Sequence, residues 1–178
     1  MPTLVAETTV RRPPAVVFDA LVDLRRYEGY SEHLASVTRT GDGGVGTEYE
    51  LRFAWWRIDY TVRSRVTAVD RPERLAFEVT SGIEADGAWS LEPITQAGDQ
   101  TPVTDDDGPS ATRVQFRVSY HPDTVAPAAL DLPALTSLSW VIDRVAPLVE
   151  REAAGVVQQV VRDLEGSDRA VDLDVTVR

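Results

Sequence analysis

The feature that most constrains the fold of this chain is the alternation of apolar and polar residues between residues 48 and 120. Apolar side chains occupy every second position, with the one exception of Ser64, in sets at 49–55, 58–68, 75–79, 89–91 and 114–120. Such alternation is typical of strands with one buried face and one solvated face. Turn residues at 70–73 and 82–87 separate the sets, so the pattern predicts a meander of antiparallel strands.

Helical spacing appears on both sides of this meander. Leu4 to Val10 predicts a first strand, and the prolines after it predict a helix from Pro13 to Asp23. An apolar stripe at three- and four-residue spacing from Leu138 to Leu164 predicts a long amphipathic helix. Pro147 lies inside this stripe, which predicts a kink or a break one turn earlier. Gly166 marks the end of the helix.

The length of 178 residues fits a single domain. We assign residues 1–165 to this domain and residues 166–178 to a C-terminal tail. Alternation at 171–177 predicts that the tail forms a short extra strand or an unpaired extension. The polar segment 94–111 contains three consecutive aspartates and predicts a solvated acidic loop, whose role is left open.

The chain is acidic, with 29 Asp and Glu against 18 basic residues, all of them arginine, and a net charge of −11. Acidity without lysine is typical of proteins from a salt-saturated cytoplasm, where salt screens self-repulsion. An acidic protein from a GC-rich genome is the alternative interpretation. Under both interpretations the net negative charge repels nucleic acids, whose binding requires clusters of cationic side chains. No apolar run approaches the roughly 18 residues of a membrane span, so we expect a cytoplasmic protein without stable membrane insertion.

Motifs for familiar cofactors are weak or missing in this sequence. Residues 41–46 match GxGxxG literally, but a strand and not a helix is predicted after the glycines, so the motif indicates a tight turn. The chain has no cysteine, and His33 and His121 lack a second ligand at metal-binding spacing. We therefore predict no cofactor and no metal site.

Aromatic residues concentrate on the predicted inner faces of the strands. They either form an ordinary core or line a cavity. Trp55 and Trp56 fall where the long stretch must turn, and large apolar side chains at a hairpin tip need a partner, a ligand portal or a covering loop. Glu152 and Gln159 flank the helical stripe. Inside a cavity, burial would raise the pKa of Glu152 and suit it to proton transfer, whereas at the stripe's edge both residues are solvated.

Three segments carry a resemblance to a known superfamily. Arg12 to Asp23, followed by Tyr27, resembles the proline-led helix of the START-like helix-grip proteins, also called polyketide cyclase/dehydrase or SRPBCC proteins and including coenzyme Q-binding proteins. Gly87 to Leu91 is similar to the recurrent Gly-x-Trp strand of that superfamily, and Leu132 to Leu164 corresponds to its closing helix. The resemblance covers nearly the whole chain.

The resemblance implies an α+β helix-grip fold. A curved antiparallel sheet of about six to seven strands wraps around the long C-terminal helix, with short helices after the first strand. The space between sheet and helix would hold an apolar small molecule or lipid. The residues expected to line this ligand cavity are Tyr49, Phe53, Trp55, Tyr60, Phe77, Trp89, Phe116, Tyr120, Val145, Val149, Glu152 and Val156.

Three functions are compatible with this resemblance. We favour a binder or carrier of an apolar ligand, for which an isoprenoid quinone is one candidate, over an enzyme. The first alternative is a polyketide cyclase or dehydratase that uses cavity tyrosines and Glu152 as acid and base. The second is a protein-interaction module with a filled core. A homodimer through exposed apolar residues is left open.

Overall fold

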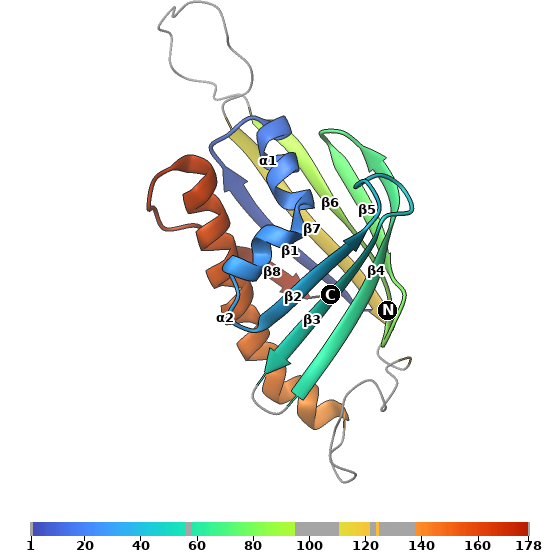
Figure 1. Ribbon diagram of the computed structural model, residues 1–178. Helices are drawn as coiled ribbons and strands as arrows, with labels where there is room; N and C mark the ends of the chain where they lie inside the picture. Colours follow the sequence, from blue (N-terminus) through green and yellow to red (C-terminus); the bar gives the residue numbers. More distant parts are fainter. Residues whose placement is uncertain (1, 56–57, 95–110, 122–123, 125–137, 178) are drawn as a thin grey trace, which may run out of the picture.

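The computed structural model describes residues 2–55, 58–94, 111–121, 124 and 138–177. These residues form an eight-stranded antiparallel sheet, in the order β2-β3-β4-β5-β6-β7-β1-β8, together with a long C-terminal helix (Figure 1). The elements are β1 (Thr3–Val10), α1 (Pro14–Val22), the 3-10 helix η1 (Leu24–Gly29), β2 (Leu34–Thr40), β3 (Glu48–Trp55), β4 (Ile58–Asp70), β5 (Arg74–Val79), β6 (Glu84–Ile94), β7 (Ala111–His121), α2 (Leu138–Glu165) and β8 (Asp174–Val177). The predicted helix-grip class is confirmed, with one strand more than the six to seven expected.

Alternation along the strands divides the sheet into two chemically different faces. On the outer face, the β3–β4 register places Glu48 opposite Arg65 and Glu50 opposite Arg63. These pairs form ion pairs of 2.8 Å and 2.7 Å between guanidinium nitrogen and carboxylate oxygen. The residues between them point to the inner face, the side that α1 and α2 cover. The apolar set of the sequence pattern therefore faces the helices, as the alternation predicts.

The fully buried part of the inner face lies around α1 and the last turns of α2. Val17, Phe18 and Leu21 project from α1, and Val161 projects from α2, into one cluster with residues of the sheet. Phe18 is 1% exposed and Val161 is also 1% exposed. We call this cluster the closed end of the grip. Its sheet members are Val10, Leu34, Val37, Tyr49, Val66, Leu75, Leu91 and Val114.

The helix α2 runs without interruption from Leu138 to Glu165, so of the kink or break predicted at Pro147 the break is wrong. Proline removes one backbone hydrogen bond, and the remaining bonds of a 28-residue helix continue on both sides of it. The predicted end of the helix is confirmed. Gly166 adopts a φ of +68°, and its N–H donates to the Arg162 carbonyl at 2.8 Å, which is a left-handed termination that glycine adopts without strain.

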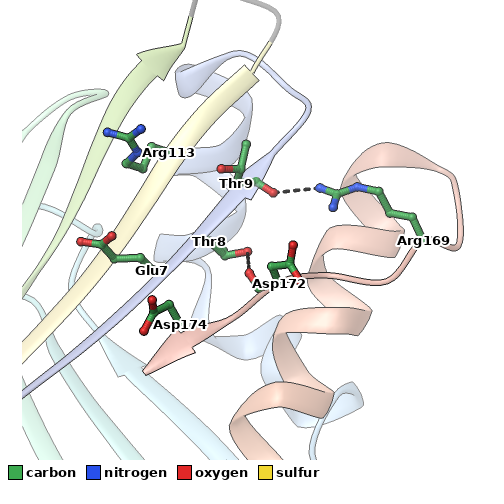
Figure 2. A pocket seen from close by; sticks show the side chains of 7 residues that line it. All are labelled: Glu7, Thr8, Thr9, Arg113, Arg169, Asp172 and Asp174. Carbon is green, nitrogen blue, oxygen red and sulfur yellow. Dashed lines mark hydrogen bonds between the residues drawn. The ribbon is translucent and has the colours of Figure 1, made fainter. Parts of the chain in front are cut away.

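The tail returns from α2 to the sheet and adds β8 beside β1, with Ala6 opposite Val175. Figure 2 shows two of the contacts that hold it. The Arg169 guanidinium donates to the Thr9 carbonyl at 2.8 Å, and the Thr8 hydroxyl donates to the Asp172 carbonyl at 2.9 Å. Of the two forms expected for the tail, the described residues adopt the strand.

The glycine-rich segment 41–46 joins two antiparallel strands, β2 and β3, as predicted for a tight turn. Gly41, Gly43 and Gly46 all have φ values between +87° and +123°, which favours glycine at these positions. The Thr47 hydroxyl accepts a hydrogen bond from the Gly43 N–H at 2.9 Å. Because β3 follows where a dinucleotide fold would begin a helix, the segment lacks the helix N-terminus that receives a pyrophosphate.

Candidate functional site

Beyond the closed end, large apolar residues on the inner face of β3–β7 are only half-buried. They lie on the side that faces α2, yet the rest of the protein does not cover them as it covers Phe18. Aromatic side chains dominate this part of the sheet. We call the six aromatic residues the aromatic patch: Phe53, Tyr60, Phe77, Trp89, Phe116 and Tyr120.

The centre of the aromatic patch is a contiguous group of rings. The Phe77 and Phe116 ring centroids lie 5.9 Å apart with planes at 14°, and the Trp89 and Phe116 centroids lie 4.4 Å apart. These distances are within the favourable range for aromatic pairs. Gly87 provides the room for this group, because a Cβ built there would lie 2.6 Å from the Phe77 ring. The glycine of the predicted Gly-x-Trp strand thus lets the Phe77 ring pack directly against the backbone of Gly87.

The predicted ligand-lining residues do not all share this environment. Six of them form the aromatic patch, and Val156 on α2 is also half-buried. Tyr49 belongs to the closed end, where it is 5% exposed and its hydroxyl donates to the Val22 carbonyl at 3.2 Å. The side chains of four residues lie outside what the structure describes: Trp55, Val145, Val149 and Glu152.

Other predictions can be placed in part. Gln159 is exposed, and its amide donates to the Tyr30 carbonyl at 3.4 Å, which agrees with the solvated one of the two positions considered for it. The backbone acceptor is provided by Tyr30, directly after η1, whose hydroxyl also donates to Asp163 of α2. Trp56 and most of the acidic loop, at 95–110, lie outside the described residues.

Sequence reasoning missed a tyrosine pair formed by Tyr27 of η1 and Tyr30, the residue directly after η1. The rings of Tyr27 and Tyr30 meet edge to face, with centroids 6.0 Å apart. Tyr30 donates its hydroxyl hydrogen to the Asp163 carboxylate of α2. Burial, together with this hydrogen bond to a carboxylate, raises the pKa of Tyr30 to about 12. The proline-led helix followed by an aromatic residue was the only signal in the sequence for this pair.

The Tyr27 hydroxyl differs from those of Tyr30 and Tyr49. Its oxygen is buried, and it makes no hydrogen bond within the described part of the chain. Burial and the neighbouring Tyr30 raise the pKa of Tyr27 far above its ordinary value, so this phenol stays neutral. Most buried polar groups in proteins are paired, and a group left unpaired costs about 1 to 3 kcal/mol. This hydroxyl is therefore an exception that requires a physical reason.

Matched removals of two hydroxyls test this difference. We expect Tyr49→Phe to lower the free energy of unfolding by about 0.5 to 1.5 kcal/mol, because the Val22 carbonyl loses its donor. Tyr27→Phe is expected to raise it by about 1 kcal/mol, because a buried hydroxyl without a partner is removed. Urea denaturation of both variants measures the two changes. A loss of stability in Tyr27→Phe equal to that in Tyr49→Phe would contradict the assignment.

Two polar hollows lie on the outer face, away from the aromatic patch. The larger, of about 250 Å³, is lined by Glu7, Thr8, Thr9, Arg113, Arg169, Asp172 and Asp174 (Figure 2). The smaller, of about 180 Å³, shares Glu7 and Arg113 with it. Glu7 accepts from the Gln115 amide at 2.5 Å, and Arg113 pairs with Glu92 at 3.6 Å. Their charged linings do not suit an apolar ligand.

The described residues include no group of three or more His, Cys, Asp or Glu side chains that could hold a metal ion. No helix in the described ranges is long and apolar enough to cross a membrane.

Solved structures share this fold at low sequence identity. The Zhui aromatase/cyclase from Streptomyces sp. R1128 has a TM-score of 0.65 and 15% identity, over 96% of this chain and 98% of that one. Ara h 8.0201 has a TM-score of 0.60 and 19% identity, over 93% and 98%. Norcoclaurine synthase from Thalictrum flavum, solved with dopamine and hydroxybenzaldehyde, has a TM-score of 0.58 and 13% identity, over 95% and 89%.

Because these sequence identities are below 20%, the similarity to the solved structures shows a shared fold and no more. Among proteins with curated functions, none matches this chain in sequence. Residues 1–165 match the family described as polyketide cyclase / dehydrase and lipid transport. The match spans every element from β1 to α2 and ends where the tail begins. The chain therefore belongs to this family of polyketide cyclases, dehydrases and lipid transport proteins.

Proposed function

We propose that this protein binds an apolar small molecule or lipid between the inner face of the sheet and α2, and that it carries the molecule unchanged. The observation that carries this proposal is the aromatic patch. Its residues lie on the helix-facing side of the sheet but are half-buried, whereas the closed end of the same face is fully buried. Apolar surface that a fold leaves partly open on a concave face is a typical site for a small ligand.

The two ends of the inner face have different chemical roles in this proposal. The closed end anchors α1 and α2 to the sheet, so the domain does not need a ligand to fold. The aromatic patch supplies planar surfaces, with Phe77, Trp89 and Phe116 in mutual contact. The outer face, with its Arg–Glu pairs, keeps the other side of the sheet in water. An isoprenoid quinone is one ligand that suits such a surface.

Binding of a neutral fluorescent probe tests this function. We expect N-phenyl-1-naphthylamine to bind the wild-type protein with increased fluorescence. Val62 lies opposite Leu51 on the inner face, and its neighbour Thr61 lies opposite Arg52 on the outer face. Val62→Glu is expected to weaken probe binding about tenfold or more, because a carboxylate there must lose water when an apolar ligand binds.

Thr61→Glu is the matched control, with the same added charge one residue away on the other face. It is expected to change the dissociation constant by less than about twofold. Circular dichroism checks that both variants are folded. Absence of probe binding to the wild type would favour the protein-interaction module with a filled core. Equal weakening by both variants would place the probe elsewhere.

The enzymatic alternative is tested with a cyclisable polyketide in place of the naphthylamine probe. Norcoclaurine synthase and the Zhui aromatase/cyclase share the fold, and Tyr60 in the aromatic patch has a pKa raised by burial, so it remains a proton donor. In the alternative, Tyr60 and Glu152 act as acid and base on a polyketide. A carrier returns the ligand chemically unchanged, so mass spectrometry of ligand recovered after incubation distinguishes the two functions.

A further inference from the structure

The buried hydroxyl of Tyr27 provides a second, chemically specific feature of the interior. The residue as a whole is half-buried, whereas its hydroxyl oxygen is buried. The side chain therefore enters from η1 and ends inside the protein. Tyr27 packs against the closed end, to which Leu51 and Phe53 of the inner face also pack. Its oxygen thus lies in the interior of the protein, on a residue that packs against the same cluster as Phe53 of the aromatic patch.

Nothing in the described residues uses this hydroxyl. Tyr30, whose ring is in contact with Tyr27, donates its own hydrogen to Asp163. A buried O–H group without an acceptor is costly. A ligand that offers an acceptor atom would satisfy it.

The electrostatic surroundings limit which acceptor fits. The phenol is neutral because burial raises its pKa far above the ordinary value. Its neighbour Tyr30 is hydrogen-bonded to a negative group, the Asp163 carboxylate. Arg26, the cation that acts on Tyr30, is more than half exposed and pairs with Asp23 at 3.5 Å. A carboxylate on the ligand would therefore lose its water without gaining a buried cation.

We infer that the Tyr27 hydroxyl donates a hydrogen bond to a neutral carbonyl oxygen of the bound ligand, so that the ligand belongs to the apolar ketones or quinones and not to the fatty acids or pure hydrocarbons. This inference rests on the proposed binding function and adds its polar specificity. The aromatic patch supplies apolar contact, and Tyr27 supplies one directional donor, the combination that fixes orientation in ligand pockets.

Three probes of the same shape separate the ligand classes: 2-acetylnaphthalene, 2-isopropylnaphthalene and 2-naphthoate. Their dissociation constants are measured by calorimetry for the wild type and Tyr27→Phe. We expect the preference for the ketone over the hydrocarbon to fall by about 2- to 10-fold in Tyr27→Phe, which is the contribution of one hydrogen bond. The ratio between two ligands removes effects of the substitution on packing that both ligands share. We expect 2-naphthoate to bind more weakly than the ketone to the wild type.

The control is Thr112→Val, which also removes a buried hydroxyl, here one that donates to the Arg12 carbonyl at 2.7 Å. It is expected to leave the ratio unchanged. If both neutral probes bind and Tyr27→Phe leaves the ratio unchanged, the inference is overturned while the binding function stands. Preference for 2-naphthoate overturns the inference in the same way. If no probe binds the wild type, the binding function and the inference fail together.

A second measurement needs no variant. Infrared difference spectra of 2-acetylnaphthalene labelled with ¹³C at the carbonyl report hydrogen bonding to the ketone in the wild-type complex. We expect the carbonyl band at a lower frequency than in hexane, because a donated hydrogen bond weakens the C=O bond. A band at the hexane position would overturn the inference even if Tyr27→Phe did not fold.

Discussion

Replacement of Glu165 by alanine is expected to lower the free energy of unfolding by about 2 to 4 kcal/mol, because the substitution removes one partner of a largely buried ion pair. The Glu165 side chain is 3% exposed, and its two oxygens accept hydrogen bonds of 2.8 Å from Arg169. The Arg11 N–H donates to the same carboxylate at 2.8 Å. Because Arg169 also bonds to the Thr9 carbonyl, the loss should extend to β1 and the tail.

Asp168→Ala provides the matched control in the same segment. Asp168 pairs with Arg162 at 2.9 Å, but the two side chains are 69% and 51% exposed. Exposed ion pairs contribute about 0 to 1 kcal/mol, so this variant should unfold close to the wild-type denaturant concentration. Chemical denaturation measures both variants. Similar midpoints for Glu165→Ala and the wild type would contradict the structural role of the pair.

The same pair predicts a pH dependence. The hydrogen bond from Arg169 lowers the pKa of Glu165 below its ordinary 4.5, with a further contribution from the Arg11 N–H. The folded protein therefore holds this proton less tightly than the unfolded chain does. The stabilisation is fully present above about pH 4.5 and is lost as the pH falls through the lowered folded-state pKa. The difference in stability between wild type and Glu165→Gln should shrink between about pH 5 and pH 3, and a constant difference would contradict the assignment.

Replacement of Gly87 by alanine is the second large effect. The new Cβ would lie 2.6 Å from the Phe77 ring and 2.7 Å from the Arg117 carbonyl oxygen, which belongs to the backbone of β7. The ring can rotate away, but the carbonyl is held in the sheet. We expect a loss of about 3 kcal/mol in the free energy of unfolding, together with weaker binding of N-phenyl-1-naphthylamine, because the Phe77 ring leaves the aromatic patch.

Gly155→Ala is the control for this substitution. Gly155 lies in α2, and a Cβ there would meet nothing within 4 Å. Alanine in a helix interior should stabilise the protein by about 0.5 to 1 kcal/mol. Thermal and urea denaturation compare the two variants. If both variants were equally stabilised, a Cβ at Gly87 would not clash with its neighbours, and this prediction would be contradicted.

Much of the fold follows from local sequence patterns. Alternation assigns each strand residue to a face, because successive side chains point to opposite sides of a sheet. It correctly separates Glu48 and Glu50 from Tyr49 and Leu51. Short turns then make sequence neighbours pair in space, which explains why the order β2-β3-β4-β5-β6-β7 follows the chain. The end of α2 at Gly166 has an equally local cause.

The candidate site depends much less on local patterns. Alternation places both Tyr49 and Phe77 on the inner face, but it does not tell that one is buried at the closed end and the other half-buried in the aromatic patch. Burial depends on what lies across the interior, and that is set by where α1 and α2 pack. Pro147 illustrates the same limit, because the local cost of proline does not interrupt the continuous helix α2.

Sequence alone therefore determined most of the strands, their faces, the two helices and the family resemblance, because each depends on residues close together in the chain. Tertiary structure decided what depends on distant residues. β1 pairs with β7 across more than a hundred positions, Glu165 meets Arg11, and Tyr27 ends in the interior without a partner. Side-chain periodicity predicts the face on which a residue lies, whereas the packing of separate elements decides which residues it contacts on that face.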